Sequence, residues 1–164
     1  GLIAAYHELD EALRRQYPLV IVGGAPSEAF LERLKKQVGT LGLNEQVKFL
    51  GRVPDDTLRK LYSSAKLFIY PSFFEGFGLP PLESIACGTP AIVSQGTSLV
   101  EVVGDAGILC DPHEPASIAV AITKVLADVS LYQTIRGNTL AQAKKFSWQE
   151  TARRTMEVYK SVTK

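Results

Sequence analysis

Two carboxylates, Glu75 and Glu83, stand on either side of a short glycine-rich stretch near the middle of the sequence. The stretch covers residues 71–83 and reads PSFFEGFGLPPLE. Its glycines, Gly76 and Gly78, can adopt backbone angles that other residues avoid, and they let a ligand approach the chain closely. An ionised carboxylate accepts hydrogen bonds and donates none, so the hydroxyl groups of a sugar are suitable partners for both acids.

Free backbone amides are the second chemical feature of this stretch. The stretch leads into a predicted helix, and Pro80 and Pro81 fit the first turn of that helix, where a missing amide hydrogen costs little. The amides just before the prolines, those of Phe77, Gly78 and Leu79, are therefore predicted to be unpaired and to face outward. Unpaired amides at the start of a helix favour an anion such as phosphate.

Taken together, the acids and the amides indicate the layout of a ligand. A carboxylate repels a neighbouring phosphate unless it faces hydroxyl groups, so the pair predicts a phosphate with polyhydroxy groups on both sides. A nucleotide sugar has that layout. Plainer alternatives stay open on these residues alone. The glycines can serve turn geometry, and Glu83, expected in the first helical turn, can simply favour the helix dipole.

The elements that must position these residues alternate between short apolar runs and amphipathic segments. The apolar runs predict strands at residues 19–22, 47–50, 67–70, 91–94 and 107–110. The amphipathic segments predict helices or helical turns at residues 2–16, 26–41, 54–65, 80–87, 98–103, 115–127, 130–144 and 148–162. Short strands separated by helices imply a three-layer α/β domain, a parallel sheet with helices on both faces.

Such a sheet also predicts where a ligand binds. In open parallel sheets the ligand lies at the carboxyl ends of the strands. That rule selects the loops that begin at Gly23, Gly51, Pro71 and Gln95. The stretch that carries Glu75 begins at one of them, so the chemistry and the fold indicate the same edge of the sheet.

Length, composition and charge exclude several classes of protein. The chain has 164 residues, with 18 Lys and Arg against 17 Asp and Glu, and two cysteines. A net charge of +1 excludes a strongly basic nucleic-acid-binding protein, and two cysteines exclude a disulfide-rich scaffold. No apolar run is long enough to span a bilayer. The chain begins with GLI and shows no signal peptide, so we expect a piece of a longer protein.

The same residues resemble a known protein family. Glu75 and Glu83 lie eight positions apart in EGFGLPPLE, and this Glu-x7-Glu pattern is similar to the signature of the retaining group 1 (family 4) glycosyltransferases of GT-B architecture. The likeness continues in SIACGTPAIVS at 84–94, VKFLGRVP at 47–54 and EVVGDAG at 101–107. The resemblance covers essentially the whole chain.

The resemblance implies a fold and a domain organisation. Members of this family have two Rossmann-like domains that face a cleft, with the nucleotide-sugar donor mainly on the C-terminal domain and the acceptor mainly on the N-terminal domain. Residues 1–164 resemble the C-terminal, donor-binding domain alone, from just after its first strand and its Arg and Lys phosphate contacts. We therefore expect the chain to lack that strand, those cations and the N-terminal acceptor domain, and to be inactive on its own.

The resemblance also implies roles for individual residues. Glu75 would be catalytic: it would accept hydrogen bonds from the donor sugar and place negative charge near the developing oxocarbenium-like centre. The amides of Phe77, Gly78 and Leu79 would hold the sugar and the distal phosphate, and Glu83 would bind the ribose hydroxyls. Transfer would proceed with retention, and the leaving phosphate would help to remove the acceptor proton.

The remaining donor contacts implied by the resemblance concern the nucleotide. The turn with Arg52 and Val53 would meet the base, with the Val53 backbone reading its edge, and Gly23 and Gly24 would pass close to the nucleotide. Oriented amides and cations, rather than a metal, would stabilise the departing diphosphate. No cofactor and no metal ion is expected, and the sequence holds no Asp-x-Asp pair.

Other residues point to no further chemistry. His7 and His113 have no third ligand in view, so a metal site is not expected at either. Ser94 and Ser98 lack a Gly-x-Ser-x-Gly context, which argues against a serine hydrolase. A dinucleotide-dependent dehydrogenase would need a Gly-x-Gly-x-x-Gly motif after the first strand, and that motif is not there.

A basic stretch near the C-terminus bears on location. Lys144, Lys145, Arg153 and Arg154 are expected to form a solvated helix face, and a weak contact with a membrane surface is the alternative. We accordingly expect a cytoplasmic protein, either free or at the inner face of the membrane, with no nucleic-acid partner.

Two functions from different classes stay open. One is transfer of a glycosyl group, a hexose such as mannose or glucose, from a nucleoside-diphosphate sugar to a glycan, a lipid-linked glycan or a small molecule. The other is a non-catalytic module of the same fold that binds a nucleotide sugar or a protein, since fold alone does not fix function. The presence of both carboxylates favours the enzyme, because a scaffold has no need of Glu75.

Overall fold

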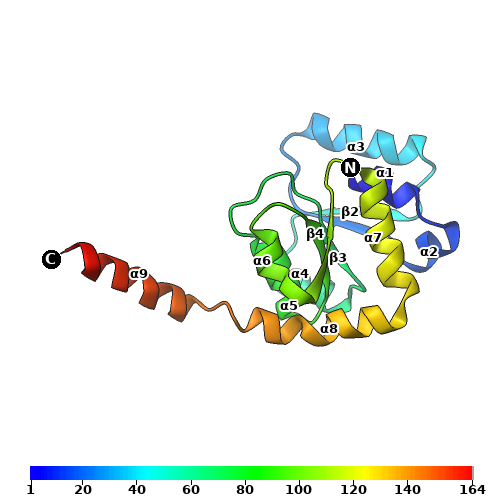
Figure 1. The fold of residues 1–164 in the computed structure, drawn as a ribbon. Coiled ribbons are helices and arrows are strands. Elements are labelled where there is room, and N and C mark those ends of the chain that lie inside the picture. Colours follow the sequence, from blue (N-terminus) through cyan, green and yellow to red (C-terminus); the bar gives the residue numbers. More distant parts are fainter. Residues whose placement is uncertain (164) are drawn as a thin grey trace.

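Short strands alternate with helices along residues 1–163, which a computed structural model describes (Figure 1). The strands are β1 (Leu19–Val22), β2 (Val47–Gly51), β3 (Phe68–Tyr70), β4 (Ala91–Ser94) and β5 (Gly107–Cys110). The helices are α1 (Leu2–His7), α2 (Glu11–Gln16), α3 (Glu28–Thr40), α4 (Asp55–Ser64), α5 (Leu79–Ala86), α6 (Leu99–Val103), the 3-10 turn η1 (Gly104–Ala106), α7 (Pro115–Ala127), α8 (Val129–Ala143) and α9 (Trp148–Val162). The predicted α/β class is confirmed.

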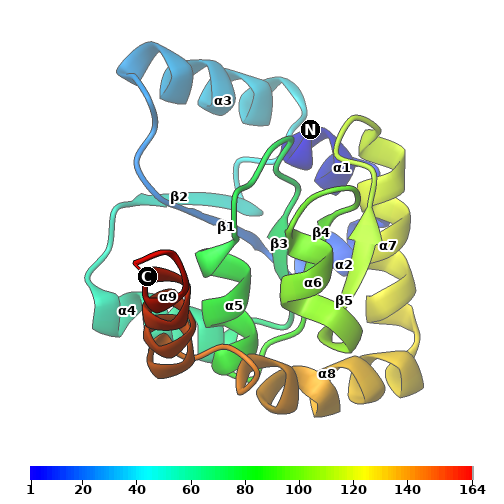
Figure 2. The ribbon, with the colours of Figure 1, turned by 60° about the vertical axis from the view of Figure 1, so that its left-hand side comes forward.

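All strand pairs are parallel, but they form two sheets rather than the single sheet that we expected. One sheet pairs β1 with β2, and the other has the order β3-β4-β5. The two sheets lie side by side in Figure 2, with β1 and β3 at the facing edges. One further strand between β1 and β3 would give the classic doubly wound order 3-2-1-4-5-6, so the division falls where the resemblance puts the family's first strand.

The larger sheet, β3-β4-β5, is covered by helices on both faces, as predicted. Because side chains alternate along a strand, Ile92 of β4 points into a core that includes α1, α3 and α7, whereas Ala91 and Val93 point into a second core with α5 and α6. All four residues of β4 are buried. This central strand therefore ties the two helical layers together.

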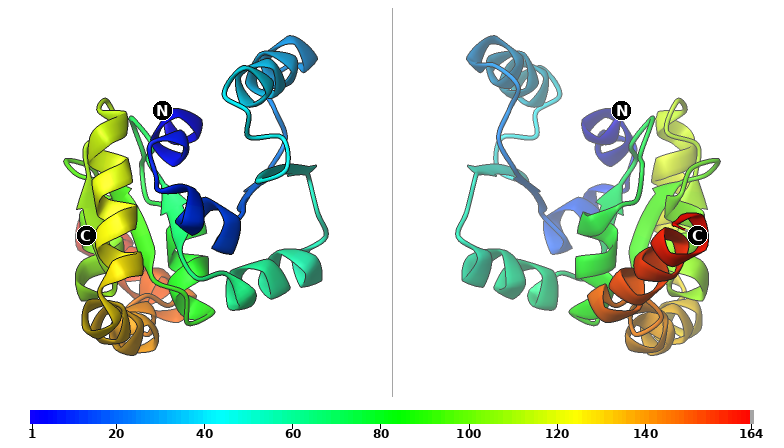
Figure 3. Two further views of the ribbon diagram at one scale, coloured as in Figure 1. Left: turned by 90° about the vertical axis from the view of Figure 1, so that its right-hand side faces the viewer. Right: turned by 90° about the vertical axis from the view of Figure 1, so that its left-hand side faces the viewer.

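The smaller sheet is covered less completely than the larger one. Leu19 and Ile21 of β1 pack against the first core, whereas Val20 and Val22 are 39% and 36% exposed. In Figure 3 the ribbon of α4 lies below β1 and β2. The second face of this sheet thus carries apolar side chains that stay partly exposed.

A single helix over residues 2–16 was expected, but the structure breaks it into α1 and α2. The Asp10 side chain accepts a hydrogen bond from the amide of Ala12 at 2.8 Å and so begins a second helix. The Arg14 guanidinium donates to the carbonyl oxygens of His7 and Leu9, which lie at the break. The apolar period of the sequence continues through the break, so the period alone could not show it.

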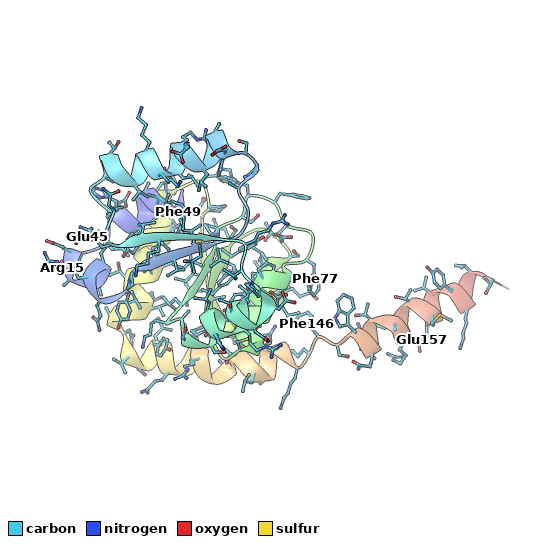
Figure 4. The ribbon with its side chains drawn as sticks, turned by 180° about the vertical axis from the view of Figure 1, so that it is seen from behind. Arg15, Glu45, Phe49, Phe77, Phe146 and Glu157 are labelled. Atoms are coloured by element: carbon cyan, nitrogen blue, oxygen red, sulfur yellow. The ribbon has the colours of Figure 1, made fainter. Side chains whose placement is uncertain are left out.

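Helix α9 extends away from the body of the protein (Figures 1 and 4). None of its residues is buried. Within residues 1–163 no single helix is long and apolar enough to cross a membrane; α7 and α8 taken together would be, but they meet at 95°.

Candidate functional site

The loop between β3 and α5 carries the glycine-rich stretch and lies at the carboxyl end of β3. Helix α5 begins at Leu79, one residue earlier than predicted, with Gly78 as its N-cap residue at φ 103° and ψ 55°. A Cβ atom on Gly78 would collide with the Leu99 side chain. Glycine is therefore required at position 78 for two reasons: the backbone is left-handed, and there is no room for a Cβ atom.

Three backbone amides at the start of α5 have no hydrogen-bond partner among the described residues; Phe77 and Leu79 are exposed as expected, whereas Gly78 is buried. Within residues 1–163, the amides of Phe77, Gly78 and Leu79 donate no hydrogen bond, while the carbonyl oxygen of Gly78 accepts one from Leu82 at 3.2 Å. The first amides of any helix lack partners inside the helix. Here they form a small group of donors at the positive end of the helix dipole, which suits an anion.

Ser98, at the start of α6, holds the loop through its hydroxyl group. Its hydroxyl lies 3.1 Å from the carbonyl oxygens of both Glu75 and Phe77. The Phe77 ring also meets the edge of the Phe146 ring, with 5.8 Å between the ring centroids. Figure 4 shows these two rings near each other, where the chain leaves α8. The loop is thus fixed by contacts from distant parts of the sequence.

Glu75 is half-buried in this loop and is held by a tyrosine. The hydroxyl of Tyr70, on β3, donates to Oε2 of Glu75 at 3.0 Å. Burial raises the pKa of Tyr70, and the hydrogen bond to Glu75 and the charge of Glu75 raise it further. The phenol consequently keeps its proton at neutral pH and remains a donor.

Glu83 is exposed on α5 and is held in the same way. The hydroxyl of Tyr62, on α4, donates to Oε2 of Glu83 at 3.2 Å. Burial, and then the charge of Glu83, raises the pKa of Tyr62. Glu83 is the fifth residue of α5, so the expectation that it lies in the first helical turn is wrong. The helix dipole acts within the first turn and is a weak explanation for an acid beyond it.

An aromatic row joins the supports of the two acids. The Tyr62 and Phe68 rings meet edge to face with centroids 5.3 Å apart, and Phe68 stacks on Tyr70 with centroids 5.9 Å apart. Phe68 and Tyr70 are two residues apart on β3 and therefore share one face of the sheet. The structure thus brings Glu75 and Glu83 to the two ends of one packed row.

The loops after β1 and β2 form a second group. A Cβ atom on Gly24 would lie 3.0 Å from Nε of Arg52, so the Arg52 side chain rests against the Gly24 backbone. The amide of Gly23 donates to the carbonyl oxygen of Gly51 at 2.8 Å. Val53 follows and is half-buried. The predicted nucleotide residues on these two loops are thus adjacent, and no hydrogen bond or ion pair of residues 1–163 joins them to Glu75 or Glu83.

The remaining titratable residues form no further site in the part of the chain that the structure describes. Within residues 1–163, no three His, Cys, Asp or Glu residues are placed to hold a metal ion. The ring of His113 packs on Phe73, with centroids 4.8 Å apart. Burial and the nearby Asp111 raise the pKa of the Cys110 thiol to about 11, which keeps it unreactive at neutral pH.

Sequence reasoning missed four residues that support the site: Tyr62, Tyr70, Ser98 and Leu99. A signal for Tyr70 was present, because it shares a strand face with Phe68 and precedes Glu75 by five positions. Ser98 was considered only as a nucleophile. Its role in holding the loop depends on a contact across 23 positions, and no local pattern shows such a contact.

Comparisons with known proteins identify the family of the chain. The family model described as "Glycosyl transferases group 1" matches residues 1–142. The O-antigen chain mannosyltransferase B of Escherichia coli is 42% identical over 161 residues, which are 98% of this chain and 42% of that protein. The chain thus spans less than half the length of this relative.

Solved structures of group 1 glycosyl transferases and related proteins have a similar fold. The crystal structure of Anabaena Alr3699/HepE in complex with UDP and glucose superposes with a TM-score of 0.87 at 28% identity, over 98% of this chain and 44% of that one. The C-terminal domain of the group 1 family protein LpcC from Francisella tularensis superposes with a TM-score of 0.73 at 24% identity, over 87% of this chain and 77% of that one. The latter likeness shows the fold alone.

Proposed function

The chain belongs to the group 1 glycosyl transferases, and we propose that it is the donor-binding domain of an enzyme that transfers a glycosyl group from a nucleoside-diphosphate sugar to an acceptor. One observation carries the proposal. Along the sequence, unpaired amides at the start of α5 stand between two glutamates, and tyrosines hold the carboxylates of both. Glu75 and the amides of Phe77, Gly78 and Leu79 receive the sugar and the distal phosphate, and Glu83 receives the ribose.

The chemistry of the groups supports this assignment. The amides supply positive dipoles for phosphate oxygens, and the carboxylates accept hydrogen bonds from sugar hydroxyls. HepE, which shares the fold and 28% of its residues, binds UDP and glucose. Arg52 and Val53 meet the base, and Gly23 and Gly24 lie beside the nucleotide, because the loops of β1 and β2 hold these four residues together.

Transfer in this proposal retains the configuration at the anomeric carbon. The bond from that carbon to the diphosphate oxygen breaks, the acceptor oxygen bonds to the same face, and the acceptor proton passes to the leaving phosphate. The negative charge of Glu75 stabilises the developing positive charge on the sugar, and the amides at the start of α5 stabilise the charge on the diphosphate. This mechanism uses no metal ion.

The sugar and the acceptor are assigned from the relatives. A relative with 42% identity is a mannosyltransferase of an O-antigen chain, which favours mannose as the sugar and a growing glycan as the acceptor. The acceptor site lies outside this chain, which spans 42% of that relative. The 164-residue chain alone therefore transfers no sugar, and product formed by it alone would contradict the proposal.

Kinetics of the complete enzyme test the two acids separately. Glu75→Gln is expected to lower kcat by about 100-fold or more while the donor Kd changes less, because Glu75 acts on charge that develops in the transition state. Glu83→Ala is expected to weaken donor binding by about tenfold and to change kcat less, because ribose is not altered in the reaction. The reverse pattern would contradict the assignment.

A separate proposal is that the basic stretch is a solvated helix face and makes no membrane contact. Arg153 and Arg154 both pair with Glu150, and Arg153 also pairs with Glu157, so acids within α9 offset part of the basic stretch. This pairing favours a solvated face in the cytoplasm over a membrane contact. The complete enzyme with Lys144 and Lys145 changed to Glu is then expected to bind anionic liposomes as the unaltered enzyme does.

A further inference from the structure

Each acid of the site uses one carboxylate oxygen for a tyrosine and keeps the other free. Oε2 of Glu75 accepts from Tyr70, and Oε2 of Glu83 accepts from Tyr62. Within residues 1–163, Oε1 of either acid takes part in no hydrogen bond. The tyrosines therefore set the direction of each carboxylate and leave one acceptor oxygen of each for a ligand.

A buried tyrosine elsewhere in the chain, Tyr6, shows what a purely structural hydroxyl does. Tyr6 donates to the backbone carbonyl oxygens of Arg14 and Tyr17, both at 3.0 Å. Tyr62 and Tyr70 donate to side-chain carboxylates instead. A tyrosine with a purely structural role could donate to a backbone carbonyl oxygen, as Tyr6 does. The bonds of Tyr62 and Tyr70 to carboxylates therefore call for a separate explanation.

The packing around Tyr62 and Tyr70 keeps their hydroxyls in place. Tyr62 is 8% exposed, and both rings pack against Phe68. A free glutamate side chain loses rotamer freedom when a ligand fixes it, and this loss weakens binding. A carboxylate that is already held by a rigid phenol avoids most of that loss, and a hydrogen bond to an ionised group is stronger than one between neutral groups.

We propose that Tyr70 and Tyr62 are positioning residues of the donor site, with Tyr70 aiming Glu75 at the sugar and Tyr62 aiming Glu83 at the ribose. The inference rests on the proposed function, and it divides the two tyrosines by the part of the donor that each one serves. Tyr70 matters only when the ligand carries a sugar, whereas Tyr62 matters for every nucleotide ligand.

Binding titrations of the 164-residue chain test this division. The probes are UDP, GDP, UDP-glucose and GDP-mannose, each titrated by calorimetry into the unaltered chain, Tyr70→Phe, Tyr62→Phe and Tyr6→Phe. Tyr70→Phe is expected to weaken binding of the sugar-bearing nucleotide by about tenfold and to leave the plain diphosphate within about twofold. Tyr62→Phe is expected to weaken both by about tenfold. Tyr6→Phe, the control, loses a hydroxyl that bonds only backbone carbonyl oxygens and is expected to change neither.

The outcomes separate this inference from the proposed function. If the unaltered chain binds none of the four probes, the proposed function fails and the tyrosine roles fail with it. If the chain binds a probe pair and both phenylalanine variants stay within about twofold for each probe, only the tyrosine roles are overturned. Equal weakening of both probes by Tyr70→Phe would also overturn them, because a general structural loss acts on both.

A measurement without ligand checks the contacts themselves, and it does not depend on how the phenylalanine variants fold. Glu75→Gln removes the charge beside Tyr70, and Glu83→Gln removes the charge beside Tyr62. We expect the pKa of the facing tyrosine to fall in each variant, since each acid raises it. NMR titration of the labelled tyrosine ring carbons measures the change. Unchanged tyrosine pKa values in both variants would overturn the positioning roles.

Discussion

The loop that carries Glu75 and the helix α9 are stabilised in opposite ways. The loop is held by residues far away in the sequence: Ser98 bonds its carbonyl oxygens, and Leu99 lies against Gly78. Helix α9 has no buried residue, and its ion pairs join residues three or four positions apart. Tertiary contacts thus give the site a fixed shape, whereas α9 depends on local contacts that are each worth little.

The largest loss of stability is expected from a methyl group added to the loop. Gly78→Ala forces a left-handed residue to carry a Cβ atom and drives that atom into Leu99, at an expected cost of about 2–5 kcal/mol in the free energy of unfolding. Gly76→Ala is the matched control, because a Cβ atom there meets open space and the φ angle is not positive. Chemical denaturation measures both variants, and equal effects would show that Leu99 does not confine the loop.

A smaller loss of stability is expected when the hydroxyl of Ser98 is removed. Ser98→Ala removes the bonds to the carbonyl oxygens of Glu75 and Phe77, which is expected to cost about 1 kcal/mol of unfolding free energy and to weaken nucleotide-sugar binding several-fold. Ser161→Ala provides the comparison in α9, where the hydroxyl bonds only the carbonyl oxygen of Val158. Calorimetry and denaturation are expected to show no change for Ser161→Ala. A Ser98→Ala variant that behaves in the same way would contradict a held loop.

The smallest effect concerns charge and pH in α9. Hydrogen bonds from Arg153 and then Arg154 lower the pKa of Glu150 to about 2, from its ordinary value of 4.5. Because the folded pKa is below the unfolded one, Glu150 supports α9 above about pH 4.5, and this support is lost as the pH falls toward about 2. NMR titration of the Glu150 carboxyl carbon and of the α9 amides measures the loss. Salt is expected to weaken the ion pairs of Glu150. Titration of Glu150 near its ordinary pKa would contradict the prediction.

The same contrast explains which features the sequence could predict. Helix α9 was predicted with both of its ends, because Ser147 accepts from the Glu150 amide and the helix needs no other part of the chain. The pair Glu75 and Glu83 and the free amides between them also follow from local spacing. The tyrosine that holds Glu83 and the serine that holds the loop do not follow from local spacing, because Tyr62 and Glu83 are 21 positions apart and Ser98 and Glu75 are 23 positions apart.

Two fold-level predictions failed for related reasons. The break between α1 and α2 depends on the hydrogen bond that Asp10 accepts from the Ala12 amide and on those that Arg14 donates, and neither residue interrupts the apolar period of residues 2–16. The division into two sheets depends on which strands pair, and the lengths and composition of β1 and β3 do not reveal that they are unpaired with each other. Periodicity identifies elements, whereas pairing and caps are decided by specific contacts.

The central claim is that the amides at the start of α5 receive the phosphates of the donor. Amide NMR spectra of the 164-residue chain, recorded while UDP-glucose or GDP-mannose is added, test it most directly. We predict that the largest shifts occur at Phe77, Gly78 and Leu79. Unchanged signals at these three amides, with shifts instead at a basic groove such as the one that Arg33 and Lys36 line beside α1, would contradict the account.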